Sequence, residues 1–529
     1  PLKEVYYTHD TTFDFNPKGH RETNYVLLGI AFLILFIAGI NFTNLTTSLI
    51  PLRLKTINTH RVLGCSIYKL QAISLIESIV ICLISYILAL FIVNDLSYTP
   101  IANWVDADIR LSQYKGLILL TALIAILTGC VAGLYPAIRS TSYAPALVLK
   151  GSFGLSPKGK KVRVALIGFQ YTVSIALIIV TLFMGLQNHF MTSSEQLGFN
   201  KDQVAIVNLT PEIYAKHKPQ YIQKLKDYPG IEDVAFSVYE LSKEDDMIDL
   251  EYARHEDKDV FFKVFYASEN FLSVMDIQVE EGRDFTREDL NKAQSDYIIN
   301  PAAERDFHLH PGDRFNDRTV LGVSKDFRFN SCRIASSPFV FALNNDIPNP
   351  KLVSYIRFNS KTNLQEAVAH VRETLKEIDP TFPFEISFYN TILNNLYQKE
   401  QTLGKLISLF GIMAILISIV GVFGLVLFET QYRRKEIGIR KINGATTGQI
   451  LLMFNKTYIR IVSVCFIISI PIAWMGTQQW LENFAYKTPL HLWVFIVAFL
   501  IILSVTIGTV TFRNWQAANE NPVNSVKSE

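Results

Sequence analysis

The side chains in this sequence that could bind a metal are few and scattered. His308 and His310 have the spacing of half a metal site, yet no Cys or third His lies nearby, so a solvated loop pair is the favoured interpretation. A short acidic run lacks the spacing and the glycine of an EF-hand and therefore indicates a solvated surface. This run comprises Glu244, Asp245, Asp246 and Asp249. We therefore expect no metal site.

Nucleotide chemistry and covalent catalysis have no recognisable motif. The chain has no GxxxxGK[ST] loop, and GSFGLSPKGK from Gly151 lacks that spacing and a preceding strand, which favours a flexible basic linker. No order of Ser, His and Asp identifies a catalytic triad without geometry. The sequence predicts a protein that is not an enzyme, with no catalytic residue and no cofactor, so any ATPase would be a separate protein.

Composition indicates a membrane protein. Of 529 residues, 49% are hydrophobic and 19% charged, against about 25% charged in ordinary soluble domains. The formal net charge of +2 argues against a nucleic-acid partner. The five cysteines form no CxxC pair, so neither a disulfide scaffold nor a zinc module is indicated.

Seven apolar runs are long enough to cross a membrane as helices. They lie at about 25–48, 71–93, 116–138, 164–186, 403–428, 457–478 and 490–512. The polar stretch between the fourth and fifth runs is too long for a loop and predicts a separate domain. Its sequence predicts mixed α and β structure, with strands from Val204, Val260 and Leu352 and a helix from Leu364. Residues 187–199 and 391–403 are expected to extend the neighbouring helices into a stalk.

Basic residues in the short loops predict the orientation, because positive charge resists translocation. The loops after the first and third runs are basic and free of acids, which makes them cytoplasmic and puts residues 1–24 and the large domain outside. Cys332, if exposed, would report this topology. An outside N-terminus beginning at Pro1 without a signal peptide suggests a missing upstream crossing. An intact chain inserted N-terminus first is the alternative.

Two features lie inside the apolar runs. Glu77 is the one carboxylate well inside a run, which suggests either a functional intramembrane charge or a side chain that reaches the neighbouring basic loop. Small residues are expected to mark helix contacts rather than a pore. They are Gly129, Gly133, Gly411, Ser418, Gly421 and Gly424.

A basic segment occurs twice with the same spacing. RLKTINTHRVLGCS contains Arg53, Lys55, Ile57 and Gly64, and RRKEIGIRKINGAT repeats them as Arg433, Lys435, Ile437 and Gly444. Arg61 aligns with Lys441, and Ser66 with Thr446. Each copy follows an outside-to-inside run and precedes two more runs, which predicts parallel repeats of one three-helix unit. Chance similarity of two basic segments is the alternative.

The second copy resembles the signature of FtsX-like permeases, the membrane subunits of MacB-type ABC transporters. The matching residues are Arg434, Lys435, Glu436, Ile437, Gly438, Ile439, Arg440, Lys441, Gly444 and Ala445. The first copy is similar but degenerate, with Thr56, Asn58 and His60 in place of Glu436, Gly438 and Arg440. INFTNLTTSL from Ile40 resembles the long, two-repeat permeases common in Bacteroidetes, and ENFLSVMDIQVEEGRDF resembles the family's extracytoplasmic core domain.

The segment Glu429–Ile450 alternates charged residues with isoleucines, which suits a short amphipathic helix on the membrane surface. Glu436 and Arg440, four residues apart, could support each other or a partner. With the resemblance, this favours an ATPase-coupling segment over a simple positive anchor. The expected coupling residues are Arg434, Lys435, Glu436, Gly438, Arg440, Lys441 and Gly444, with Arg53, Lys55, Arg61 and Gly64 in the first copy.

The resemblance implies a helical protein of the bacterial cytoplasmic membrane, with seven transmembrane helices in two repeats and an extracytoplasmic mixed α/β domain on a helical stalk. Its expected parts are the end of a missing first extracytoplasmic domain at 1–24, a three-helix FtsX-like unit at 25–150, a cytoplasmic linker at 151–163, a fourth helix at 164–186, a MacB-like core domain at 187–402, and a second three-helix unit with a cytoplasmic tail at 403–529.

The implied function is that of an ABC permease subunit, which couples a separate, dimeric ATPase to movement of the extracytoplasmic domain for export or release of an amphiphile or peptide. Expected partners are this ATPase, membrane lipid and an extracytoplasmic protein, with no nucleic acid. Two alternatives stay open. One is a signalling or scaffold protein that gates an extracytoplasmic enzyme such as a cell-wall hydrolase, and the other is a membrane-anchored binding module without an ATPase.

Overall fold

The computed structural model describes residues 21–99, 102, 110–142, 157–193, 197–242, 249–256, 258–292, 294–343 and 352–519. Seven helices in these ranges are long and apolar enough to cross a membrane, which confirms the predicted number of spans. The spans are Asn24–Ile50, Ile67–Leu96, Lys115–Thr141, Val164–Thr192, Glu400–Gly424, Thr447–Leu481 and Leu492–Trp515.

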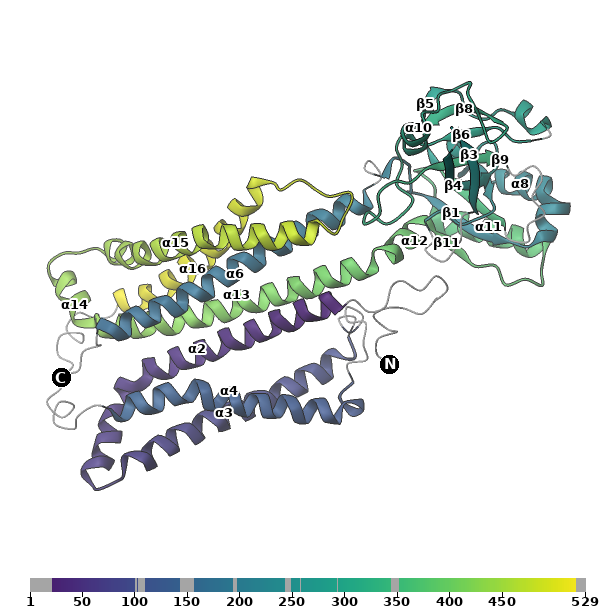
Figure 1. Cartoon of the computed structure of the whole chain (residues 1–529). Coiled ribbons are helices and arrows are strands. Elements are labelled where there is room, and N and C mark those ends of the chain that lie inside the picture. Colours follow the sequence, from purple (N-terminus) through teal and green to yellow (C-terminus); the bar gives the residue numbers. More distant parts are fainter. Residues whose placement is uncertain are drawn as a thin grey trace. The chain divides into compact units, whose positions relative to one another are not determined.

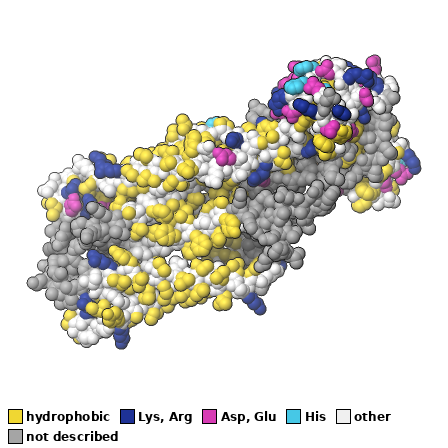
Figure 2. Space-filling model, in the orientation of Figure 1, with side chains coloured by type: hydrophobic (Ala, Val, Ile, Leu, Met, Phe, Trp, Pro, Cys, Tyr) yellow, Lys and Arg dark blue, Asp and Glu magenta, His cyan; other side chains and the backbone are white. Residues whose placement is uncertain are grey.

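The chain forms two compact units, which we call the helical unit and the α/β unit. The helical unit comprises Pro1–Gly185, Thr402–Gln479 and Leu490–Glu529, and the α/β unit comprises Leu186–Gln401 and Trp480–Pro489. Apolar side chains cover the long helices, whereas charged side chains gather on the strand-containing domain (Figure 2). This contrast follows from the solvent of each part, since lipid accepts apolar surface at no cost.

The first three-helix unit consists of α2 (Arg21–Val62), α3 (Ile67–Leu96) and α4 (Lys115–Thr141), with a short 3-10 turn η2 (Leu111–Gln113) before α4. Glycines let α3 and α4 approach closely. A Cβ at Gly129 would lie 2.9 Å from the Ile79 Cα, and one at Gly133 would lie 2.5 Å from the Ser78 Cβ. The GxxxG pair therefore marks a helix contact, as predicted.

The second three-helix unit repeats this order (Figure 1). It consists of α13 (Gln398–Tyr432), the short α14 (Arg434–Ile442), α15 (Thr447–Leu481) and α16 (Leu492–Ala518), and α6 (Pro157–Thr192) is the additional span. The small residues of α13 contact two helices. Gly421 lies against Asn41 of α2, Asn41 Nδ2 donates to the Ile417 carbonyl at 2.6 Å, and the Ser174 and Ser418 hydroxyls are 2.9 Å apart.

The α/β unit is built on an eleven-stranded mixed sheet (Figure 1). The main path runs β11-β1-β10-β2-β4-β9-β6-β8-β5, with β3 paired to β4 and β7 paired to β8. The strands are β1 (Val204–Leu209), β2 (Ile231–Ser237), β3 (Asp249–His255), β4 (Lys258–Ala267), β5 (Val279–Gly282), β6 (Tyr297–Ile299), β7 (Arg314–Phe315), β8 (Arg318–Ser324), β9 (Phe339–Leu343), β10 (Leu352–Phe358) and β11 (Ile386–Phe388).

Helices cover both faces of this sheet. Alternate residues of each strand point to opposite sides, and both sets contribute apolar side chains to a buried core. In β1, Ala205 and Val207 belong to one buried core and Val204 and Ile206 to the other. The first core includes residues of α8 (Lys218–Lys226), α10 (Pro301–Phe307) and α11 (Leu364–Ile378), and the second includes residues of α9 (Phe271–Met275) and α12 (Tyr389–Leu396). Two single turns complete the unit, η3 (Ile213–His217) and η4 (Arg287–Asn291). The predicted strands and the helix from Leu364 are confirmed.

The expected stalk is shorter than the sequence suggested. Helix α6 ends at Thr192, and α13 begins only at Gln398, after a break at Tyr397. Residues 389–396 form the separate helix α12, whose Tyr389 and Leu393 are buried in the α/β core. Because these side chains are buried in the α/β core, residues 389–396 form a separate helix and do not extend α13.

Candidate functional site

The basic segment of the second repeat is a short helix with a sharp end. Helix α14 begins after a break at Arg433, so the expected amphipathic segment 429–450 is divided among the end of α13, α14 and the start of α15. After α14, Gly444 has φ +88°, its N–H donates to the Lys441 carbonyl, and the Ala445 N–H donates to the Arg440 carbonyl. This pair of bonds is the Schellman motif, which requires a left-handed residue.

The first repeat ends its basic segment with the same turn. Gly64 has φ +91°, its N–H donates to the Arg61 carbonyl, and the Cys65 N–H donates to the His60 carbonyl. Here, however, the segment is the last part of the continuous 42-residue helix α2. The glycines that align in the two repeats therefore have the same backbone role, while the helix break before them is present in the second repeat.

Several basic side chains of the two segments contact acids or carbonyls of the helical unit. Arg53 Nη1 lies 2.8 Å from Glu77 Oε2 on α3, and Arg433 Nη2 lies 3.1 Å from Glu429 Oε1 on α13. Arg61 Nη1 donates to the carbonyl of Thr141 at the end of α4, 3.0 Å away. Glu77 thus reaches the basic segment beside it, and the aligned arginines of the repeats form ion pairs with different helices.

The second segment also has a charged pair on its surface. Glu436 Oε1 and Arg440 Nη2 are 2.7 Å apart, one helical turn along α14, and both side chains are about half exposed. Ile437 and Gly438 are buried, whereas Ile442 of this segment and its counterpart Val62 are each 65% exposed. The side chains of Lys55, Arg434 and Lys435 lie outside the described part of the structure, and Lys441 is half-buried.

The structure adds a feature that the sequence did not predict. Trp480–Pro489, which we call the junction segment, joins α15 to α16 in the chain but belongs to the α/β unit. The Tyr486 N–H donates to the Cys332 carbonyl at 3.1 Å, and its hydroxyl accepts from the Ser336 N–H at 3.1 Å. The structure therefore groups this loop, which lies inside the expected unit at 403–529, with the α/β unit.

Gln187 fixes the junction segment through both ends of its amide. Its Nε2 donates to the Tyr486 carbonyl at 3.0 Å, and its Oε1 accepts from the Thr488 N–H at 2.8 Å. The side chain is fully buried. Because both amide atoms are paired, substitution by a side chain without this amide would leave two backbone groups unpaired.

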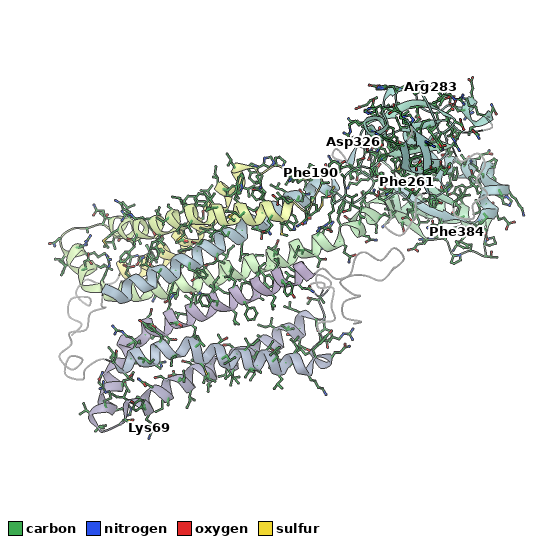
Figure 3. All side chains as sticks on the ribbon, viewed as in Figure 1. Lys69, Phe190, Phe261, Arg283, Asp326 and Phe384 are labelled. Carbon is green, nitrogen blue, oxygen red and sulfur yellow. The ribbon has the colours of Figure 1, made fainter. Side chains whose placement is uncertain are left out.

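Aromatic and cationic side chains complete the junction. Phe484 is buried with Met191, Cys332 and Tyr397, and the Trp480 ring lies 5.0 Å from the Phe484 ring. The Arg328 guanidinium lies 4.1 Å from the Tyr486 ring centre and near Phe190, which is labelled in Figure 3. The aromatic content of this short loop is the sequence signal that could have revealed its packing.

An ion pair and a buried thiol lie beside Phe484 of the junction segment. Arg333 Nε lies 2.7 Å from Glu400 Oε1, and its guanidinium lies 4.7 Å from the Phe484 ring centre. Burial raises the pKa of the Cys332 thiol, which also accepts a hydrogen bond from the Tyr397 hydroxyl. A thiol kept neutral by burial is a poor nucleophile, so this cysteine has a packing role.

The sequence analysis considered His308 and His310 as a pair, whereas the structure places His310 beside two glutamates. His310 lies with Glu281 and Glu304, and the ligand atoms of these three residues are all within 4.8 Å of one another. His308 is not part of this group. Of the acidic run, Glu244, Asp245 and Asp246 lie outside the described residues, and Asp249 begins β3.

Comparison with known proteins finds the same family description twice in the chain. "FtsX-like permease C-terminal" matches residues 28–145 and 408–522, which are the two three-helix units. The chain is 25% identical over 212 residues to the macrolide export ATP-binding/permease protein MacB of Aggregatibacter actinomycetemcomitans, covering 38% of this chain and 32% of that protein. It is also 25% identical over 223 residues to MacB of Neisseria gonorrhoeae, covering 40% of this chain and 34% of that protein.

Two solved structures resemble part of the chain. The periplasmic region of MacB from Actinobacillus actinomycetemcomitans is 14% identical with a TM-score of 0.29, covering 39% of this chain and 97% of that one. The extracellular domain of the noncanonic ABC-type transporter YknZ from Gram-positive bacteria is 15% identical with a TM-score of 0.26, covering 35% of this chain and 99% of that one.

The chain spans about a third of the length of the curated relatives it matches. The family description covers both three-helix units, which confirms the internal repeat. Seven long apolar helices and a separate α/β unit complete the architecture that the sequence predicted. The chain therefore contains two FtsX-like permease segments and resembles MacB proteins, and it is a multi-pass inner-membrane protein with a large extracytoplasmic domain.

Proposed function

We propose that this chain is the permease subunit of an ABC system, in which a separate ATPase acts on the cytoplasmic turns and the extracytoplasmic domain moves in response. Family membership supports the permease role. The sequence has no nucleotide-binding loop, which supports an ATPase on another chain. The chain itself would be a non-enzymatic subunit.

The two cytoplasmic turns have properties suited to docking. Each ends in a glycine turn and exposes large apolar side chains beside basic residues, Val62 and Leu63 in the first turn and Ile439 and Ile442 in the second. Apolar side chains within a polar or charged rim are a common arrangement in protein interfaces. The second turn adds Glu436 and Arg440 on its surface, which supports its role as the stronger contact.

The observation that carries the proposal is the junction segment. It is covalently continuous with α15 and α16, and it is held inside the α/β unit by Gln187, Cys332 and Ser336. Movement of these two helices would therefore pull directly on the extracytoplasmic domain. The hydrogen bonds and the buried Phe484 would transmit that force because they leave the segment little freedom.

The substrate class we propose is an amphiphile or peptide, handled on the extracytoplasmic side. Polar side chains of the spans join helices to each other, as the Ser174 hydroxyl joins that of Ser418 and the Tyr171 hydroxyl joins that of Thr506. Such pairs favour a closed bundle over an aqueous channel for a hydrophilic solute.

The test is a reconstituted system with the partner ATPase, identified by co-purification from native membranes and mass spectrometry. Gln187→Ala should reduce the stimulation of ATP hydrolysis by the permease about tenfold, because it leaves two buried backbone groups of the junction segment unpaired. Thr192→Ala is the matched control, since this hydroxyl bonds only within α6 among the described residues. Unchanged coupling in Gln187→Ala, with normal membrane insertion, would contradict the proposal.

A further inference from the structure

Three side chains that commonly bind metals meet at one corner of the α/β unit. Glu281 comes from the edge strand β5, Glu304 from α10, and His310 from the turn between α10 and β7. Their ligand atoms lie within 4.8 Å of one another, and His310 Nδ1 is 3.6 Å from Glu304 Oε1. Figure 3 labels Arg283, which follows β5 at this corner, and Figure 2 shows histidine beside acidic side chains on this domain.

The backbone at each of these three residues is held by contacts of its own. Glu281 pairs with Val323 of β8, and Gly322 approaches the Glu281 carbonyl so closely that a Cβ there would lie 2.7 Å from its oxygen. The His310 N–H donates to Asp313 Oδ2 at 2.8 Å. Helix α10, which carries Glu304, is capped by the buried side chain of Asn300. The meeting of the three side chains is therefore a result of the fold.

Among the described residues, the ionisable partner of Glu304 is the His310 imidazole, whereas the acids elsewhere in the same corner are paired with lysine or arginine. Asp289 is paired with both Arg283 and Lys292, and Asp296 is paired with Lys292. In the described part of the chain, no Lys or Arg lies within 4.0 Å of Glu281 or Glu304. The His310 imidazole is the group beside these carboxylates that can carry positive charge, and a divalent cation would bring a larger positive charge to the same three ligand atoms.

We propose that Glu281, Glu304 and His310 bind a divalent transition-metal ion, for which zinc is the probe. One imidazole nitrogen and two carboxylate oxygens are a donor set that zinc accepts, with ligand bonds of about 2.0 to 2.2 Å. Around such an ion the ligand atoms lie about 3.4 Å apart. The exposed Glu281 and His310 side chains can close this difference by rotamer changes.

The bound ion has two consequences for the extracytoplasmic domain. It ties the edge strand β5 to α10 and to the following turn, which are joined otherwise through β6 and β8. Because the chain supplies three ligands and two of them are exposed, the remaining coordination position faces solvent and accepts water or a donor group of another molecule.

The experiment uses the full chain in detergent, purified with a tag free of histidine and treated with a chelator. Zinc is then titrated in competition with a chromophoric chelator. The wild-type chain should bind one equivalent, and Glu304→Gln and His310→Asn should each weaken binding by at least about tenfold. The matched controls are Glu280→Gln and His308→Asn, since neither residue belongs to the group and Asn tolerates the left-handed backbone of His308, φ 52°.

Wild-type affinity in His310→Asn, or an equal loss in His308→Asn, would overturn the proposal. A second measurement needs no variant and so does not depend on the folding of a substituted chain. Zinc should slow hydrogen exchange in residues 279–282 and 301–313 of the wild-type chain, as a ligand that ties these segments together must. Exchange that zinc leaves unchanged in both segments would also overturn it.

Discussion

Asp289 shows how a single carboxylate organises a corner of the extracytoplasmic domain. Its oxygens accept from Arg283 at 2.7 and 2.9 Å, and from the Thr286 N–H and hydroxyl at 2.9 and 2.8 Å. The Arg283 guanidinium, with these bonds and Lys292, holds the pKa of the Asp289 carboxyl well below its ordinary value of 3.8. The residue is buried, so these contacts contribute to stability.

We predict that Asp289→Asn destabilises this corner by about 2 to 3 kcal/mol at pH 7. Because the folded carboxyl has the lower pKa, the unfolded chain binds the proton first as pH falls. The stabilisation is therefore complete above about pH 5 and declines below it, so the difference between variant and wild type should shrink from pH 7 to pH 3. Hydrogen exchange of residues 283–300 measures this, with the exposed neighbour Glu288→Gln as the control. A pH-independent difference would contradict the assignment.

The cytoplasmic turns differ at three aligned residues. The second turn has Glu436, Gly438 and Arg440 where the first has Thr56, Asn58 and His60. Asn58 is buried, and its Nδ2 donates to the Leu54 carbonyl of its own helix, so this residue serves the fold of α2. In the second turn the exposed Glu436–Arg440 pair contributes little to stability, which leaves both charges available to a partner.

Under the proposed function, Glu436→Ala and Arg440→Ala should reduce ATPase stimulation far more than Thr56→Ala and His60→Ala. A charge-assisted hydrogen bond lost from a desolvated interface is worth about 1.5 to 3 kcal/mol, or about tenfold or more in affinity. Membrane insertion should be unchanged in all four variants because the pair is exposed. Equal effects in the two repeats would mean that the degenerate turn docks as well as the other.

Among the elements, α3 and α4 depend on close approach at two glycines. Gly133 faces Ser78, whereas Gly116 at the start of the same helix has no atom near the position of a Cβ. Gly133→Ala should therefore destabilise the helix pair by about 1 to 3 kcal/mol through overpacking. Gly116→Ala is the matched control and should be neutral or stabilising by up to about 1 kcal/mol.

Thermal unfolding of the two variants in detergent measures this difference. A lower midpoint in Gly133→Ala, with an unchanged or higher midpoint in Gly116→Ala, is the expected result. If both variants unfold like the wild type, α3 and α4 do not pack through this glycine. The comparison tests packing alone, since both substitutions add the same methyl group to the same helix.

For the whole molecule, the topology can be tested with cysteines. Cys332 is buried and does not serve as the external reporter that the sequence suggested. A cysteine at exposed Lys361 in the extracytoplasmic domain should react in whole cells with a membrane-impermeant maleimide, once the outer layer is permeable. The native Cys65, in the first cytoplasmic turn, should react only after lysis. Labelling of Cys65 in whole cells would invert the topology.

The sequence by itself determined the parts of this protein that depend on local pattern. Long apolar runs gave the seven spans because lipid requires about 20 consecutive apolar residues in a helix. Alternating runs gave β1, β4 and β10. The repeated glycine spacing identified Gly64 and Gly444 as equivalent positions. Both have a left-handed backbone, a conformation that depends on the residue at that one position.

The tertiary structure decided which distant residues meet. Gln187 and Tyr486, Arg53 and Glu77, and Glu281 and His310 are joined by the fold, and no local pattern connects their positions in the chain. The same holds for burial: a cysteine in a polar stretch is covered because a loop from another part of the chain packs on it. Such contacts depend on long-range packing. Its free energy is the sum of many small contributions from side chains in different segments, so no single segment predicts it.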